Sequence, residues 1–136
     1  MIKLFKLLLL SLLIFSPLKS NETSIKIRVN NKIITSTDLI AEYNYLIALN
    51  NELKELDKSI IVKLAKASII RETIKKEELL RYYDLDEDSD LLNSVVKNFY
   101  NKLGIKDIEE FTNYLDGYNL KLEYVKKKIR IEMLWN

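Results

Sequence analysis

Three aspartates at alternate positions, Asp86, Asp88 and Asp90, have the spacing of the first ligands of a calcium-binding loop. Such a loop needs a glycine at its sixth position and a bidentate glutamate at its twelfth. These positions hold Leu91 and Lys97. We therefore interpret the acidic run as a solvated loop that also caps the helix after it, and we expect no metal ion here.

A cluster of basic residues, Lys126, Lys127, Lys128 and Arg130, could in principle contact phosphate groups. On a helix these side chains would point in different directions and alternate with apolar residues. We interpret the cluster as a solvated helix face rather than a phosphate-binding site.

Other groups that could perform catalysis are few. The chain has no His and no Cys, which removes the commonest general base, the Ser-His-Asp triad and thiolate zinc sites. The chain has only two glycines and lacks those that a P-loop, a dinucleotide fingerprint and a nucleophile elbow require, so these motifs are excluded. The carboxylate pairs Glu77–Glu78 and Glu109–Glu110 have no partner base. The sequence thus predicts no catalytic residues and no cofactor.

The composition favours a mainly helical domain that carries a small N-terminal β-hairpin and about five helices. Apolar residues make up 48% of the chain and charged residues 31%, while Gly and Pro number only two and one. Residues 25–35 alternate between apolar and polar around Asn30–Asn31, a pair suited to a tight turn. Two of the expected helices begin at about Asp38 and Asn119. The other three span about Lys58–Tyr83, Leu91–Leu103 and Ile108–Asp116.

Capping signals mark several of these helix ends. Thr35 with Asp38, and Asp107 with Glu110, have capping-box spacing. Asp57 can cap the longest helix. Gly104 and Gly117 follow apolar-periodic runs, and each can adopt the left-handed conformation that ends a helix.

Apolar periodicity predicts which helix faces are buried. In the first helix Leu39, Tyr43 and Leu46 lie on the expected core stripe, with Ile40 and Ile47. Tyr45 and Leu49 lie nearly opposite, as either a second buried contact or a binding surface. The first half of the helix over 58–83 is apolar nearly all round and predicts neighbours on several sides. Its charged second half predicts solvent exposure.

The last helix is still apolar where the sequence stops, at Trp135 and Asn136. A docked terminal helix would explain this. Alternatively Ile131, Leu134 and Trp135 would be exposed, and would serve self-association, a partner or a further C-terminal segment.

Residues 1–20 have the pattern of a signal peptide. Lys3 and Lys6 precede an apolar run over 7–15, and a helix-breaking, small-residue segment ends at Ser20. The run is too short to span a membrane, which needs about 20 residues, although an uncleaved amphipathic anchor remains an alternative. Without residues 1–20 the chain has 19 basic and 20 acidic residues, so its formal net charge falls from +2 to −1. This argues against nucleic acid as a partner.

Two stretches of residues 25–136 resemble the N-terminal domain of the SurA-type periplasmic chaperones, a trigger-factor-like domain. The first is residues 27–39 (IRVNNKIITSTDL), which lead from the hairpin into a helix. The second is a downstream set, made up of Gly104, Phe111, Leu115, Gly117, Asn119, Lys128, Ile129, Arg130, Glu132 and Met133.

The resemblance implies an exported periplasmic chaperone domain over residues 21–136 that holds unfolded outer-membrane β-barrel polypeptides. The expected mechanism is capture by apolar and tyrosine side chains, without stable membrane insertion after signal removal. The candidate contact residues are Tyr45, Leu49, Tyr100, Tyr114, Tyr118 and Trp135, and core packing is the alternative role of each.

An enzymatic alternative also stays open. In the family a parvulin-type prolyl isomerase domain follows the N-terminal domain. This chain contains no parvulin stretch, so the resemblance does not carry isomerase activity to it. The chain would then be the N-terminal part of an isomerase whose catalytic domain is absent.

Overall fold

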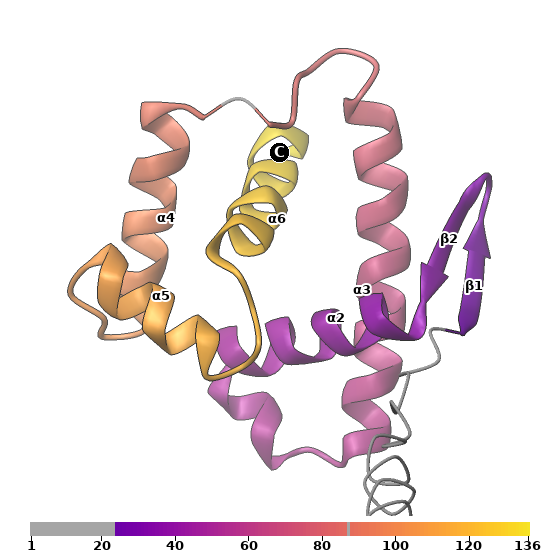
Figure 1. Cartoon of the computed structure of the whole chain (residues 1–136), viewed down its shortest axis with the longest axis horizontal. Coiled ribbons are helices and arrows are strands. Elements are labelled where there is room, and N and C mark those ends of the chain that lie inside the picture. The colour runs from indigo at the N-terminus through magenta and orange to yellow at the C-terminus, as the bar shows by residue number, and fades with distance from the viewer. Residues whose placement is uncertain (1–23, 87) are drawn as a thin grey trace, which may run out of the picture.

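Five α-helices and a two-stranded hairpin make up residues 24–86 and 88–136, the part that the computed structural model describes. This confirms the predicted mainly helical fold (Figure 1). The expected signal peptide lies outside these residues. In chain order the elements are β1 (Ile25–Val29), β2 (Lys32–Thr35), α2 (Ser36–Leu49), the 3-10 helix η2 (Asn51–Glu55), α3 (Lys58–Leu79), α4 (Asp90–Lys102), α5 (Ile108–Asp116) and α6 (Leu122–Trp135).

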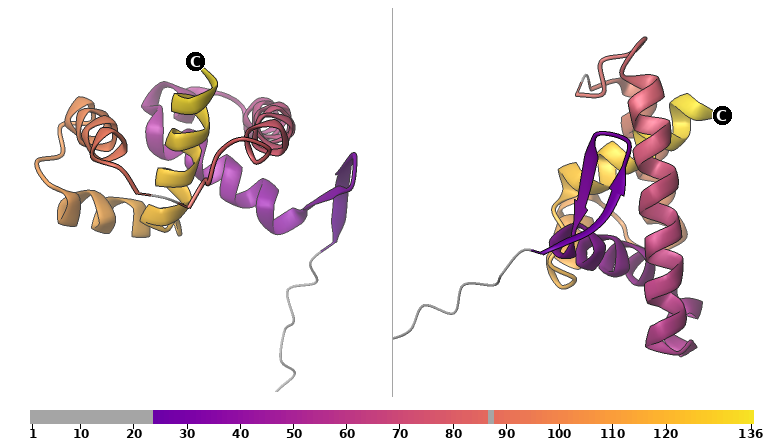
Figure 2. Two further views of the ribbon diagram at one scale, coloured as in Figure 1. Left: turned by 90° about the horizontal axis from the view of Figure 1, so that it is seen from above. Right: turned by 90° about the vertical axis from the view of Figure 1, so that its right-hand side faces the viewer.

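The hairpin forms where alternation and the Asn-Asn pair predict it. β1 and β2 pair antiparallel, with Val29 opposite Lys32. Asn30 adopts a left-handed conformation with φ 50°, which asparagine tolerates better than most residues. The hairpin lies beside α3 (Figure 2). This contact gives it the support that an isolated hairpin lacks in water.

Local capping fixes most helix starts. Thr35 and Asp38 form the predicted capping box, so α2 begins at Ser36, two residues before the expected start. Asp107 accepts a hydrogen bond from the Glu110 backbone N–H, and α5 has the predicted bounds. Asp57 precedes α3, but its side chain makes no capping hydrogen bond. α3 ends at Leu79, four residues earlier than predicted.

The two glycines behave differently from each other. Gly104 has φ 78° and ends α4 as expected. Gly117 has φ −59°, so the predicted left-handed geometry is wrong there; Asn119, with φ 55°, adopts it instead. Because Asn119 completes this turn, it does not cap the last helix. α6 begins at Leu122, after Lys121.

α6 lies between α3 and α4 and contacts both (Figure 1). A smaller core joins Ile131 to Leu79 and Leu85 on the side of α3. Ile131 is fully buried, so the prediction that it is exposed at the end of the chain was wrong. On the other side lies the main core, formed by Ala48, Leu92, Val96, Tyr100, Ile105, Phe111, Leu115, Leu120, Val125 and Ile129.

The predicted core stripe of α2 was wrong at Ile40, and its other members, Leu39, Tyr43, Leu46 and Ile47, are only partly buried. Ile40 is 61% exposed, whereas Glu42 and Ala48, on other faces, are buried. Tyr45 and Leu49 pack against the main core. The reason is that α2 packs against α3 and also reaches the main core, so the faces it buries differ from those of a helix on a single core.

The predicted environment of α3 was also wrong in both halves. Ile60, Val62 and Leu64 are exposed, because the described helices cover only the face of Ile61, Ala65 and Ile69. The charged second half is half-buried rather than solvated, since α6 packs against α3.

Replacing Gly104 by alanine should lower the free energy of unfolding by about 1 kcal/mol, because left-handed backbone costs an L-residue about 1–2 kcal/mol. An added Cβ would meet no atom within 4 Å, so the cost is conformational only. Urea denaturation measures it. The matched control Gly104→Asn should cost less, since asparagine tolerates this conformation; equal losses in the two variants would contradict the explanation.

Candidate functional site

The predicted contact residues lie mostly in or against the main core. Tyr45 and Leu49 are partly buried there, and Tyr45 packs edge-on against Tyr124 with ring centroids 6.2 Å apart. Tyr100 is only 7% exposed, and its ring lies 5.6 Å from that of Phe111. These three residues therefore stabilise the fold, which was the alternative role considered for each.

Tyr114 and Tyr118 form a second pair, with ring centroids 5.2 Å apart. The Tyr114 hydroxyl donates a hydrogen bond of 2.7 Å to the Ala48 carbonyl, and burial raises the pKa of Tyr114 to about 12. Lys54 Nζ donates to the Tyr118 hydroxyl at 2.6 Å and lowers the pKa of Tyr118. This pair thus ties α5 and the turn after it to the end of α2 and to η2.

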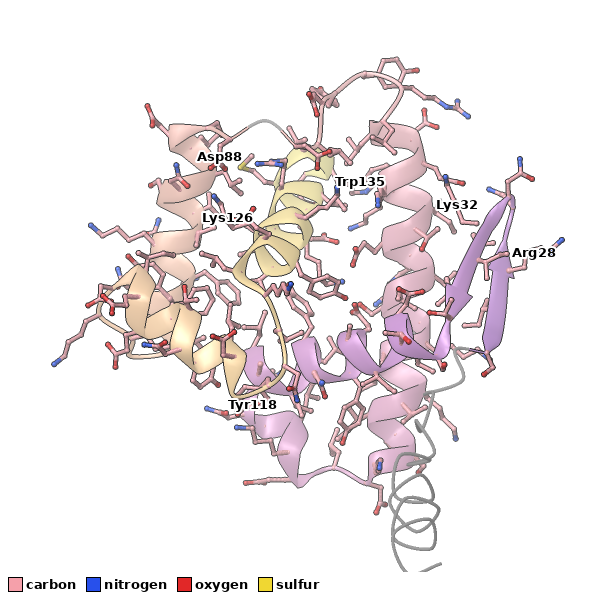
Figure 3. All side chains as sticks on the ribbon, viewed as in Figure 1. Arg28, Lys32, Asp88, Tyr118, Lys126 and Trp135 are labelled. Atoms are coloured by element: carbon pink, nitrogen blue, oxygen red, sulfur yellow. The ribbon has the colours of Figure 1, made fainter. Side chains whose placement is uncertain are left out.

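Of the six predicted contact residues, only Trp135 is exposed, at 46%. Lys75 Nζ lies 5.7 Å from the centre of its ring, a cation–π contact between α3 and α6. Figure 3 labels Trp135 on α6, on the side that faces α3. The structure thus does not gather the six residues into one surface.

A buried ionic centre joins three helices and was missed by sequence reasoning. Lys128 of α6 is 4% exposed, and its Nζ donates to Glu42 Oε2 of α2 at 2.5 Å. Glu72 of α3 contacts the same ammonium. The Tyr124 hydroxyl donates to Glu42 at 3.2 Å, and Lys128 Nζ lies 4.5 Å from the centre of the Tyr45 ring. The available signal was a lysine within the apolar positions of a predicted helix.

The ionic centre shifts the pKa values of its members. Burial lowers the pKa of Lys128, and the Glu42 carboxylate opposes this shift. Burial raises the pKa of both Tyr45 and Tyr124, and the negative charge of Glu42 raises it further. Glu42 is fully buried, and its Oε1 has no hydrogen-bond partner among the described residues. The centre therefore depends on the Lys128 charge.

The rest of the basic cluster pairs with the acidic loop, so the predictions of a solvated helix face and a solvated loop were both incomplete. Lys126 Nζ lies 2.8 Å from Asp88, and Lys127 Nζ lies 2.7 Å from Asp86. Arg130 contacts Asp88 and donates to the Leu85 carbonyl. These hydrogen bonds lower the pKa of Asp86 and Asp88. Figure 3 labels Asp88 and Lys126 in the space between α4 and α6.

The open apolar surface lies between α2 and α3 instead. A groove of about 270 Å³ runs where the N-terminal turns of the two helices meet. We call it the α2–α3 groove. It is lined by Leu39, Ile40, Tyr43, Asn44, Lys58 and Val62.

Comparison with protein-family models, with curated proteins and with solved structures finds no match for this chain. Within residues 24–86 and 88–136, no three His, Cys, Asp or Glu side chains are placed to hold a metal ion. None of the described helices combines the length and the apolar content needed to cross a membrane.

Lys128→Ala should lower the free energy of unfolding by about 3–5 kcal/mol, because it leaves Glu42 buried without its counter-ion. The matched control Lys127→Ala should cost less than about 1 kcal/mol, since its partner Asp86 has a side chain that is 82% exposed. Urea denaturation compares the two variants. The double variant Glu42→Gln/Lys128→Met should recover part of the stability lost in Lys128→Ala. Equal losses in Lys128→Ala and Lys127→Ala would contradict the cost assigned to leaving Glu42 without its counter-ion.

Tyr45→Phe should flatten the loss of stability at alkaline pH. Because the pKa of Tyr45 is raised, the folded protein keeps this proton where the unfolded chain loses it, above about pH 10. The stability that Tyr45 contributes is thus fully present below about pH 10 and falls progressively as the pH rises towards the higher pKa of the folded state. Urea denaturation between pH 8 and 11 measures the difference. Tyr82→Phe, at an exposed position, is the control, and parallel curves for wild type and Tyr45→Phe would contradict the assignment.

Proposed function

We propose that this chain is an exported chaperone domain of the SurA type, which holds unfolded polypeptide segments through the α2–α3 groove. Its clients would be outer-membrane β-barrel polypeptides in the periplasm. The resemblance of residues 25–136 supports the family, the client and the compartment. The observation that carries the binding activity is the apolar surface that α2 and α3 leave exposed.

Several large apolar side chains on these two helices are only partly covered by the other described residues. Ile40 is the most exposed of them, and Val62 faces it across the groove. Ile60 and Leu64, one helical turn apart on α3, add a second exposed strip. Single exposed apolar residues are normal, but a lined apolar groove is typical of a binding surface.

The chemistry of the groove suits a client without a fixed sequence. Leu39, Ile40 and Val62 offer apolar contact. Tyr43 adds a ring that can pack on apolar groups and a hydroxyl that can form hydrogen bonds. Asn44 and Lys58 supply a polar rim. The groove volume of about 270 Å³ is below the roughly 300–1,000 Å³ of a typical ligand pocket. The groove therefore has room for only a few side chains. It therefore favours a weak, reversible hold.

The proposal places the contact surface away from all six predicted contact residues, since none of them lines the α2–α3 groove. The rings of Tyr100, Tyr114 and Tyr118 are engaged with core partners, as are Tyr45 and Leu49. Binding a client through them would require opening the core. The side chains of the α2–α3 groove need no such rearrangement.

The double variant Ile40→Glu/Val62→Glu should reduce suppression of aggregation of an unfolded β-barrel protein, with a loss of affinity of about tenfold or more. Two carboxylates in the groove would replace apolar contacts worth about 1.5–3 kcal/mol per fully buried side chain. Light scattering during dilution of the client from urea measures the effect. The matched control is Leu91→Glu, because Leu91 is also exposed but lies on α4.

Circular dichroism must first show that both variants are folded. If the groove variant and the Leu91 variant suppress aggregation as well as the wild type, the groove is not the holding surface. A proline-limited refolding reaction tests the enzymatic alternative, and acceleration by the wild-type chain would refute a pure holdase.

A further inference from the structure

The α2–α3 groove has a positive charge beside its apolar surface. Of the described residues that line it, Lys58 alone is charged. The other lining side chains are three aliphatic residues, one tyrosine and one asparagine. A few charged or polar groups beside apolar lining fix which ligands such a site prefers. This lining therefore favours an occupant that carries both an apolar and an anionic group.

The part of α3 that continues from the groove is also positive. Residues 58–71 contain four cations, Lys58, Lys63, Lys66 and Arg71, and no Asp or Glu. All four are exposed, and none of their charged nitrogen atoms lies within 4.0 Å of a described carboxylate oxygen. By contrast, every basic residue of α6 pairs with a carboxylate. These α3 cations are thus available to an external anion.

The carboxylates of α2 and α3 closest to this stretch leave it positive. Asp38 belongs to the Thr35 capping box, and Glu42 and Glu72 belong to the ionic centre. Asp57 directly precedes α3 and offsets part of the charge at its first turn. Lys66 lies farther along the helix from Asp57, by a rise of about 13 Å, which exceeds the roughly 8–10 Å over which salt screens exposed charges.

The spacing of the two lysines next to Val62 matches an extended polypeptide. Lys58, Val62 and Lys66 are four residues apart, so they are neighbours along one side of α3, with a rise of about 6 Å between each pair. Alternate side chains of an extended chain lie on one face, about 6.6–6.8 Å apart. Three alternate side chains of a bound segment can therefore meet these three residues in turn, and the middle one also meets Ile40 across the groove.

We infer that the groove selects extended segments in which an apolar residue has an acidic residue two positions before it and two positions after it. The apolar side chain packs between Val62 and Ile40, and the two carboxylates pair with Lys58 and Lys66. The inference rests on the proposed function, because it names the client class of the same groove.

The observations favour a polypeptide over an anionic membrane as the partner. The middle side chain has to enter a groove between two helices, which a separate chain can do and a flat bilayer surface cannot. Without residues 1–20 the formal net charge of the chain is also −1, which gives no overall attraction to anionic lipids.

Fluorescence anisotropy with the 136-residue chain tests the inference. The probe is a nonapeptide of Asp, Ser and Leu with that spacing, amidated at its C-terminus and labelled with an uncharged dye. At low salt it should bind about fivefold more tightly than the same peptide with Asn in place of Asp, the size expected from two exposed ion pairs. At about 0.5 M salt the difference should largely disappear.

A third peptide tests the spacing. It has the same composition, but each Asp stands directly beside a Leu, so that the two side chains lie on opposite faces of an extended chain. This peptide should bind no more tightly than the Asn peptide. Equal binding of the two Asp peptides would overturn the assigned motif.

The variant Lys58→Gln/Lys66→Gln should remove most of the preference for Asp over Asn and leave the affinity for the Asn peptide unchanged. The matched control is Lys97→Gln/Lys102→Gln, which removes two exposed lysines of α4 and should keep the preference. Thermal unfolding verifies that both variants are folded. Equal effects of the two variants would overturn the inference.

The remaining outcomes separate this inference from the proposed function. If the Asp and Asn peptides bind equally, and Ile40→Glu/Val62→Glu abolishes the binding of both, the charge preference is refuted and the groove remains the holding surface. No binding of any peptide at millimolar concentration would also overturn the inference, while the aggregation assay decides the proposed function independently. Displacement of the Asp peptide by phosphatidylglycerol vesicles, but not by phosphatidylcholine vesicles, would identify an anionic membrane as the partner and overturn the polypeptide assignment.

Discussion

The fold depends on one buried lysine. Lys128 contributes a charge from α6 to carboxylates of α2 and α3, so three helices converge on a single ammonium group. Burying these charges costs desolvation energy, and a pair of apolar residues could stabilise the same space as well or better. The ionic centre adds specificity, because the buried Glu42 carboxylate meets its counter-ion only when α6 presents Lys128 to it. We infer that the centre fixes the position of α6 against α2 and α3.

The position of α6 determines which surfaces stay open. With α6 between α3 and α4, its apolar residues divide between two cores, and Ile131 and Val125 are buried on different sides. Tyr45 of α2, Tyr114 of α5 and Tyr124 of α6 then pack around the larger core. α3 is covered by α2 and α6 along one face only, so Ile60, Val62 and Leu64 stay exposed. The same arrangement leaves a cleft between α3 and the hairpin open.

Local features of this fold could be predicted from the sequence, and non-local ones could not. The hairpin turn, the Thr35 capping box and the bounds of α5 follow from residues within a few positions of each other. The buried face of α2 does not, because periodicity identifies the apolar residues of a helix but not the neighbours that cover them. Glu42 and Lys128 are 86 residues apart, so neither pattern alone indicates the pair. The acidic loop and the basic cluster could be identified in the sequence, but that they pair with each other depends on the topology.

In the proposed function, the exposed side of α3 would have to bind apolar groups without causing the protein to aggregate. Lys58, Lys63 and Lys66 are exposed along the same half of the helix as Ile60, Val62 and Leu64. Charges interspersed in this way break a continuous apolar patch into small areas, which keeps a surface soluble. An apolar segment can still pack on each small area and against the lysine stems, but the contact area stays limited. A limited contact area favours release of a bound segment, which is the property that the proposed holding function needs and that a permanent interface would lack.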